Sequence, residues 1–125
     1  MELQNGLRAV SSEMVEESKC AVNVGSGDLM VYATPAMTAL MENAAMKAVA
    51  AALSDGSTTV GSSISVSHVK PSPVGRVITA TAVLQQVDGR KLTFSVSASD
   101  PQGIIGEGTH VRYIVDREKF LSKLL

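Results

Sequence analysis

Residues 34–53 read TPAMTALMENAAMKAVAAAL, and this stretch decides the fold. Alanine and methionine, which are both strong helix formers, dominate it. Thr34 suits a helix N-cap, Pro35 suits the first helical position, and Ser54-Asp55-Gly56 provides a stop. The pattern predicts one helix over residues 34–53, about 30 Å long at 1.5 Å per residue. Because apolar residues occupy most of its circumference, we expect the helix to be largely buried.

Four strands are predicted after this helix, because apolar and polar residues alternate there with period two. They cover residues 59–69, 76–87, 90–99 and 104–115. Asp88-Gly89 is a strong two-residue hairpin signal between the second and third of these strands. On the first of them, the alternation predicts one shared face for Val60, Ile64, Val66 and His68.

The flanks of this region complete the expected architecture. The alternation of Ser18, Cys20, Val22 and Val24 predicts a further strand over residues 14–24, followed by a loop at 25–28. The tail, residues 116–125, is at most a short amphipathic helix. A single helix covered by one antiparallel sheet is an α+β arrangement, here with about five strands wrapped around the helix. We expect one domain over residues 1–125, and an exposed edge strand that pairs with a second copy in a dimer.

Composition excludes several classes of protein. The chain has 125 residues with 11 Lys and Arg against 12 Asp and Glu, and this balance argues against nucleic-acid binding. One cysteine rules out an intrachain disulfide and a Cys-based zinc site, and two histidines without HExxH spacing predict no metal site. No stretch approaches the roughly 20 apolar residues of a membrane span, and the N-terminal residues lack a signal-peptide pattern. We therefore expect a cytoplasmic protein without membrane partners.

Three residues are candidates for chemistry, each with a structural alternative. His68 is either a half-buried histidine bonded to a backbone carbonyl or a general base with a tuned pKa. Glu42 is either an exposed helix charge or a buried carboxylate acting as acid, base or nucleophile. Thr34 needs no reason beyond capping. Thr34 and Glu42 are eight residues apart, about 12 Å along a helix, so a second protomer or the substrate would have to bridge them.

Glycines mark two further positions. Gly61 inside a strand indicates either a bulge or close backbone approach by a ligand, with an amide available to an oxyanion. By parity, His110 and Arg112 share a face with Gly106 and Gly108. That face is either an exposed edge or the place where Arg112 contacts an anion such as a phosphate.

Taken together, several segments resemble one known family over roughly residues 10–121. The spacings of eight residues from Thr34 to Glu42 and of 26 from Glu42 to His68 fit it jointly. The family is the hotdog-fold thioesterases, in the fluoroacetyl-CoA thioesterase-like branch. The matching pieces are Tyr32-Ala33-Thr34, Met37, Leu40-Met41-Glu42, Gly61, His68, Pro73-x-Gly75, Val87-Asp88-Gly89-Arg90, Ile105-Gly106-x-Gly108-Thr109-His110-x-Arg112 and Phe120.

The resemblance implies a homodimeric acyl-CoA thioesterase, with dimers that could pair into tetramers. It implies that Thr34, Glu42 and His68 form the catalytic group at the dimer interface, with Glu42 attacking the thioester or activating water. Gly61 matches a backbone position near the thioester carbonyl, and Arg112 matches an arginine near the site. Lys70 could meet a phosphate of coenzyme A, which is part of the substrate. No separate cofactor is implied.

One stretch departs from the family pattern. Fluoroacetyl-specific members carry an aromatic lid before the matching threonine, whereas residues 25–31 here read GSGDLMV and contain no phenylalanine. We therefore expect a different short or medium acyl group. The sequence also leaves two alternatives to a thioesterase open. One is a non-catalytic acyl-CoA-binding hotdog protein. The other is a hotdog hydratase or dehydratase, whose Asp–His motif is not found here.

Overall fold

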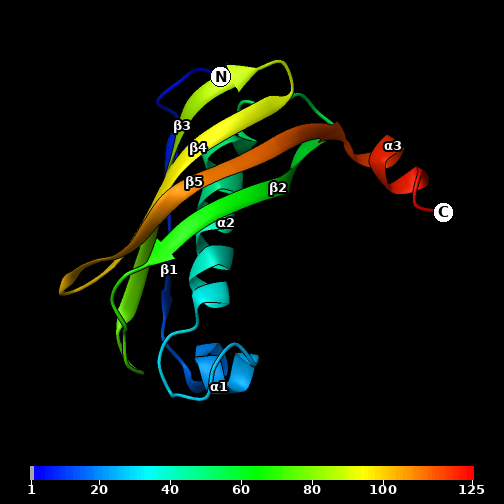
Figure 1. Cartoon of the computed structure of the whole chain (residues 1–125). Helices are drawn as coiled ribbons and strands as arrows, with labels where there is room; N and C mark the ends of the chain where they lie inside the picture. The colour runs from blue at the N-terminus through cyan, green and yellow to red at the C-terminus, as the bar shows by residue number, and fades with distance from the viewer. Residues whose placement is uncertain (1) are drawn as a thin grey trace.

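In the computed structural model, which describes residues 2–125, one antiparallel sheet curls around one long helix (Figure 1). The strand order across the sheet is β1-β3-β4-β5-β2, so β1 and β2 form its two edges. This arrangement confirms the α+β class and the four strands after the helix. The elements are β1 Arg8–Met14, a 3₁₀ turn Glu17–Lys19, α1 Ala21–Val24, α2 Thr34–Ala50, β2 Ser57–His68, β3 Val77–Asp88, β4 Lys91–Asp100, β5 Gly103–Asp116 and α3 Arg117–Ser122.

The long helix, α2, is only half covered by the sheet. Eight of its seventeen residues are buried, and the opposite face, with Ala39 and Met46, is exposed, so the expectation of a largely buried helix is wrong for that face. The helix ends at Ala50, three residues before the predicted end. Beyond it, the backbone amides of Ala52 and Leu53 donate hydrogen bonds to carbonyls three residues earlier. This is the tighter 3₁₀ spacing that is common at helix ends.

The strand predicted over residues 14–24 is wrong, because the first strand is β1 at Arg8–Met14. β1 turns Ser11 inward and leaves Val10 and Met14 exposed, which is the reverse of an ordinary half-buried strand. Ser11 bonds through its hydroxyl to Asn43 of α2 at 2.7 Å. Polar contacts therefore fix this edge of the sheet to the helix, and the apolar alternation at 18–24 falls in short helical turns instead.

A bulge in β2 changes which residues face the helix. The pairing of β2 with β5 shifts between Gly61 and Ser63. Before the bulge, Gly61 pairs with the inward-facing Arg112, so its neighbour Val60 lies on the outer face. After it, Ile64 pairs with the inward-facing His110. The prediction that Val60 shares a face with Ile64 and His68 is wrong for this reason, because one extra residue inverts the alternation.

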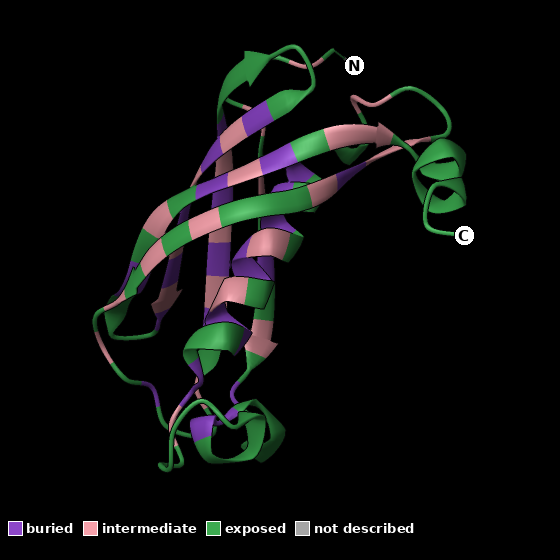
Figure 2. Cartoon of the chain, turned by 45° about the vertical axis from the view of Figure 1, so that its right-hand side comes forward, coloured by how far each residue is buried: buried purple, intermediate pink, exposed green. Residues whose placement is uncertain are grey.

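The core lies between α2 and the inner faces of β3 and β4. Every second residue of these two strands is buried along most of their length, which Figure 2 shows as alternating bands of colour. The largest apolar side chains that are fully buried are Tyr32, Phe94, Met37, Met41, Ile78, Leu84, Leu92 and Ile105. Because both β3 and β4 are interior strands of the sheet, the core sits under its centre and leaves the β2 edge thinly covered.

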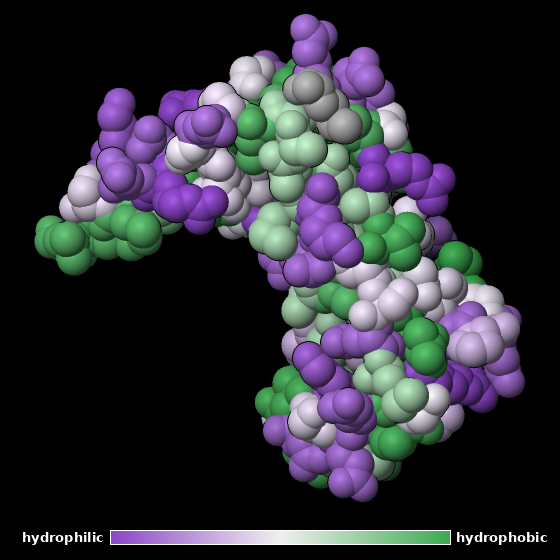
Figure 3. All heavy atoms as spheres, turned by 180° about the vertical axis from the view of Figure 1, so that it is seen from behind, coloured by the Kyte–Doolittle hydropathy of each residue, from purple (hydrophilic) through white to green (hydrophobic). Residues whose placement is uncertain are grey.

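The C-terminal helix, α3, extends away from the body of the molecule (Figure 1). Asp116 caps it by accepting a hydrogen bond from the Lys119 amide at 2.9 Å. The end of this projection is hydrophobic in the view from behind (Figure 3), where Leu124 and Leu125 are exposed. The short helix predicted for the tail is confirmed.

Candidate active site

Thr34 and His68 form a hydrogen-bonded pair at the start of α2. Thr34 Oγ1 lies 2.8 Å from Nδ1 of His68. Thr34 is the first residue of the helix rather than its cap, because Ala33 occupies the cap position and makes no side-chain cap bond. The expected capping role of Thr34 is therefore wrong, and its hydroxyl is used to hold the histidine ring.

Two backbone links bring these residues together from segments 34 positions apart. The Tyr32 amide, two residues before Thr34, donates to the Ser72 carbonyl at 2.9 Å, and Val31 forms an isolated bridge with Pro73. The Ser72 hydroxyl in turn donates to Asp100 at the end of β4, at 2.9 Å. The chain that enters α2 and the loop that leaves β2 are thereby held side by side.

The ring of His68 has one nitrogen free for chemistry. Its Nε2 is buried and has no hydrogen-bond partner among the described residues. Burial lowers the pKa of His68 below its ordinary value, and the nearby Lys70 backbone opposes this only in part. The Tyr32 ring packs edge-on at 6.4 Å between centroids. At neutral pH His68 is consequently an uncharged base.

A pocket of about 250 Å³ opens beside this pair. Its walls come from α1, the segment before α2, and the loop after β2. They comprise Ala21, Ser26, Val31, Tyr32, Thr34, His68, Val69, Lys70 and Pro71. Lys70 therefore lines the same pocket as His68, whereas Glu42 does not.

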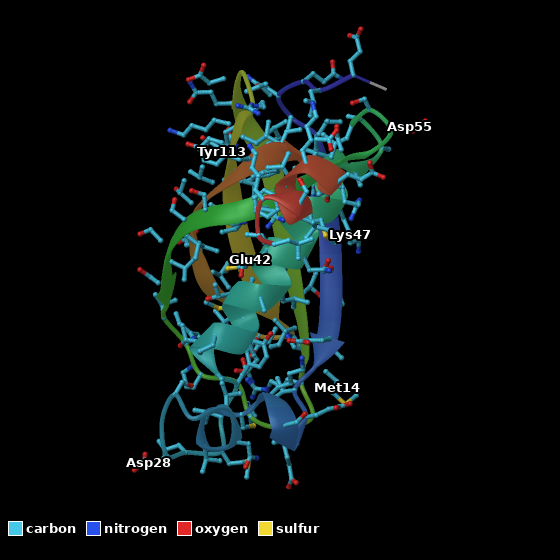
Figure 4. All side chains as sticks on the ribbon, turned by 90° about the vertical axis from the view of Figure 1, so that its right-hand side faces the viewer. Met14, Asp28, Glu42, Lys47, Asp55 and Tyr113 are labelled. Atoms are coloured by element: carbon cyan, nitrogen blue, oxygen red, sulfur yellow. The ribbon has the colours of Figure 1, made fainter. Side chains whose placement is uncertain are left out.

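Glu42 belongs to a second cluster, about 12 Å further along α2. A methyl group placed on Gly61 would lie 2.8 Å from Oε2 of Glu42, and 3.4 Å from both Arg112 Nη1 and His110 Cε1. Figure 4 shows Glu42 on the side of α2 that faces β2. The carboxylate forms no hydrogen bond or ion pair with a described residue, although it acts electrostatically on both His110 and Arg112. Gly61 is thus glycine because Glu42 approaches it closely, and a bulge does follow it, as expected.

His110 and Arg112 lie on the inner face of β5, so the interpretation of an exposed edge is wrong. Their exposed fractions are 1 % and 7 %. Arg112 donates from Nε to Thr59 Oγ1 at 2.8 Å and from Nη2 to the Thr59 carbonyl at 2.9 Å. Nη1 of Arg112 makes a third hydrogen bond, to Nε2 of His110 at 3.3 Å. The sequence indicated the pairing of His110 with Arg112 by parity, but nothing in it pointed to Thr59.

Within one chain, the predicted site residues therefore form two groups. Thr34, His68 and Lys70 line the pocket, and Glu42, Gly61 and Arg112 meet between α2 and the β2 edge. Sequence reasoning missed Ser72 and Asp100, which hold the His68 loop in place. Their only signal in the sequence was position, because Ser72 lies between two prolines and Asp100 directly follows the strand predicted at 90–99.

Two kinds of site have no candidate in the described part of the chain. Residues 2–125 contain no group of three or more His, Cys, Asp or Glu side chains that could hold a metal ion. No helix among them is long and apolar enough to cross a membrane.

A curled five-stranded antiparallel sheet around one long helix is the hotdog fold, which this chain shares with solved thioesterases. The family model described as fluoroacetyl-CoA-specific thioesterase matches residues 15–118. The chain belongs to this family and is a thioester hydrolase.

Individual relatives agree with this placement. The fluoroacetyl-CoA thioesterase of Streptantibioticus cattleyicolor is 43 % identical over 94 residues, which cover 75 % of this chain and 68 % of that protein. A solved structure of a fluoroacetyl-CoA thioesterase superposes with a TM-score of 0.91 at 34 % identity, covering 99 % of this chain and 96 % of the other. A thioesterase superfamily member from Thermus thermophilus, at 24 % identity, shares the fold with a TM-score of 0.90, over 97 % of this chain and 90 % of that one.

Proposed function

We propose that the protein hydrolyses a short acyl-CoA thioester in a homodimer, where Thr34 and His68 of one protomer act with Glu42 of the second. The observation that carries this proposal is the free Nε2 of His68, buried at a pocket while Thr34 holds the other ring nitrogen. A histidine held in this way is arranged for proton transfer. The family supplies the reaction class, and the geometry supports the assignment of roles.

The proposed chemistry needs one water and no cofactor. With Nδ1–H of His68 donating to Thr34 Oγ1, the Nε2 lone pair takes a proton from water as its oxygen attacks the thioester carbonyl. Glu42 accepts a hydrogen bond from the second hydrogen of the water, which stays on the attacking oxygen, and its negative charge stabilises the imidazolium that forms. Collapse of the tetrahedral intermediate breaks the C–S bond, and His68 returns its proton to the departing thiolate. The products are the free acid and coenzyme A.

Two features support a homodimer. β2 is an edge strand, and its residues Gly61, Ser63 and Ser65 are exposed, so its free backbone groups can pair with a second chain. The separation of Glu42 from His68 within one chain is the second, because a partner's helix can bring a carboxylate that the same helix cannot. Leu121 on α3 and Leu124 just after it are exposed and offer further apolar contact surface.

The pocket and its rim suit an acyl group without an aromatic lid. A pocket of about 250 Å³ beside His68 has room for a short or medium acyl chain. Ser26 and Val31 line it from the stretch that lacks the aromatic lid of fluoroacetyl-specific members. Lys70 at the mouth offers a positive charge to a phosphate of coenzyme A. A related fluoroacetyl-CoA-specific thioesterase, 35 % identical, has been solved with fluoroacetate and CoA, over 94 % of this chain and 99 % of that one, with a TM-score of 0.88.

Thiol release from a panel of acyl-CoAs tests the proposal. We expect release from short-chain members, with Glu42→Gln and His68→Ala each lowering kcat/KM by about 100-fold or more, as for loss of a general base. Glu107→Gln makes the same chemical change at an exposed position of β5 and should leave the rate unchanged. Silence on every acyl-CoA would overturn the substrate class. Full activity in both site variants would overturn the assignment of residues.

A further inference from the structure

His110 is held by both of its ring nitrogens although its side chain is buried away from solvent. Nδ1 lies 2.8 Å from the carbonyl oxygen of Ser63, at the bulge of β2. A carbonyl can only accept, so Nδ1 carries the hydrogen and Nε2 of the neutral ring is an acceptor. Nη1 of Arg112 donates to that acceptor at 3.3 Å. The ring is therefore fixed as one tautomer.

Arg112 is fixed on a second side by Thr59, which receives hydrogen bonds from Nε and Nη2. Together with His110, Thr59 leaves the guanidinium little freedom to rotate. Nη1 remains close to the open position at Gly61, 3.4 Å from where a side chain there would begin. Glu42 approaches the same position from α2, at 2.8 Å. The fixed guanidinium of Arg112 and the carboxylate of Glu42 thus both border the space at Gly61.

We propose that His110 is a positioning residue for the thioesterase reaction. Its role is to hold the Arg112 guanidinium beside the space between Gly61 and Glu42. This inference rests on the proposed function, because it gives that fixed charge a role beside the reacting carboxylate. Simple filling of space does not account for the ring. A phenylalanine would pack equally well against Phe94, whose ring lies 6.2 Å away, but would satisfy neither Ser63 nor Arg112.

The charge state of His110 agrees with this role. Burial lowers its pKa, and the adjacent Arg112 lowers it further, while the Ser63 carbonyl and Glu42 act in the opposite direction. The net shift is downward, so the ring is neutral at pH 7. A protonated ring would direct an N–H toward the N–H of Arg112 and release the guanidinium.

Three substitutions separate the two hydrogen bonds of His110. His110→Gln can place its carbonyl oxygen where Nε2 was and keep an acceptor for Arg112. His110→Asn can keep a donor for Ser63 but is too short to reach Arg112. His110→Phe keeps the ring volume and loses both bonds. We expect kcat/KM to fall by about tenfold or more in the Asn and Phe variants, the size of a lost bond to a charged group, and by less in the Gln variant.

Thiol release and the midpoint temperature of thermal unfolding, Tm, are measured for each variant. If His110 has a purely structural role, activity falls only in variants whose Tm falls. If it positions Arg112, kcat falls even in variants that remain folded at the assay temperature. If the His110 variants do not fold, Thr59→Val, which removes the acceptor for Nε of Arg112, is expected to lower kcat/KM in the same way. A folded His110→Phe variant with wild-type kcat/KM, or a folded Thr59→Val variant with wild-type kcat/KM, overturns the inference. A silent wild-type enzyme overturns the proposed function and this inference with it.

Discussion

Gly61 and Glu42 meet so closely between β2 and α2 that a methyl group on Gly61 would lie 2.8 Å from Oε2 of the carboxylate. The backbone at Gly61 is not in the left-handed region, so an added side chain would meet a lack of space rather than backbone strain. The atom that would be displaced is the end of a flexible side chain. A substitution at Gly61 therefore acts on the position of the carboxylate more than on the fold.

We predict that Gly61→Ala lowers kcat/KM by about tenfold or more while changing the free energy of unfolding by less than about 1 kcal/mol. Thiol release and urea denaturation measure the two effects. Gly108→Ala is the matched comparison, because its methyl group would overlap the Ser65 carbonyl oxygen and lie 2.8 Å from the Cα of Val66. Here backbone must move, so we expect a loss of about 2 kcal/mol or more. Equal destabilisation by both variants would contradict this account of Gly61.

Mixing two inactive variants tests whether one site uses both protomers. Glu42→Gln and His68→Ala are unfolded together and refolded at equal concentration, and thiol release is compared with wild type. If the site crosses the interface, about a quarter of wild-type activity returns, since about half of the dimers are mixed and each has one intact site of two. Recovery of no activity, with mixed dimers present, would place the whole site within one chain.

The control for this mixing experiment is Thr34→Val with His68→Ala. These two residues are hydrogen-bonded within one protomer, so a mixed dimer has no intact site. We expect activity no higher than the mean of the two separate variants. Recovery in this pair as well would indicate that mixing restores stability and not the site.

The fold was predictable from the sequence wherever side-chain pattern and burial coincide. The helix predicted over 34–53 and the strands flanking Asp88-Gly89 have apolar faces that enter the core; all three form, and the helix ends at Ala50. The first strand was not predictable, because Ser11 points inward and is satisfied by Asn43, while Val10 is exposed. In such a strand the inward residues are polar and the outward residues are apolar, so the usual hydrophobic alternation does not indicate it.

The candidate site was predictable by residue type and less so by arrangement. Thr34, Glu42 and His68 were singled out by residue type and grouped by the family resemblance, but a bond from Thr34 to His68 in place of a helix cap was not predicted. Gly61 indicated a bulge as one of two alternatives, but the inverted alternation of β2 after it was not predicted. Long-range contacts such as Thr59 with Arg112 depend on the register of β2 against β5, which a single sequence does not contain.

The threonine–histidine pair leads to a prediction about the hydroxyl group. Thr34→Val has nearly the same shape as threonine but removes Oγ1, so Nδ1 of His68 loses its partner. We expect kcat/KM to fall by about tenfold or more, while Thr34→Ser, which keeps the hydroxyl, retains most of the activity. Thiol release across the acyl-CoA panel measures both. Equal loss in the two variants would indicate that the methyl group matters and the hydrogen bond does not.

Asp100 connects the pH dependence of stability to the loop that follows His68. Its carboxylate is fully buried and accepts hydrogen bonds from Ser72 at 2.9 Å, Arg76 at 3.0 Å and the Gln102 amide at 2.8 Å. Burial alone would raise the pKa of Asp100, but these bonds and the charge of Arg76 outweigh it and lower the pKa below its ordinary value. The folded state therefore favours the ionised form.

A lowered pKa stabilises the fold fully above the unfolded value near 3.9, and this contribution is lost as the pH falls through the folded value. At pH 7 we expect Asp100→Asn to cost about 3 kcal/mol, because it leaves Arg76 unpaired in a partly buried site. Below about pH 3.9 the difference between the variant and wild type should shrink. Asp88→Asn, in the exposed β3–β4 turn, should change stability by less than about 0.5 kcal/mol at either pH. Urea denaturation across this pH range measures all three proteins, and a constant deficit in Asp100→Asn would show that the ionised carboxylate is not what stabilises the loop.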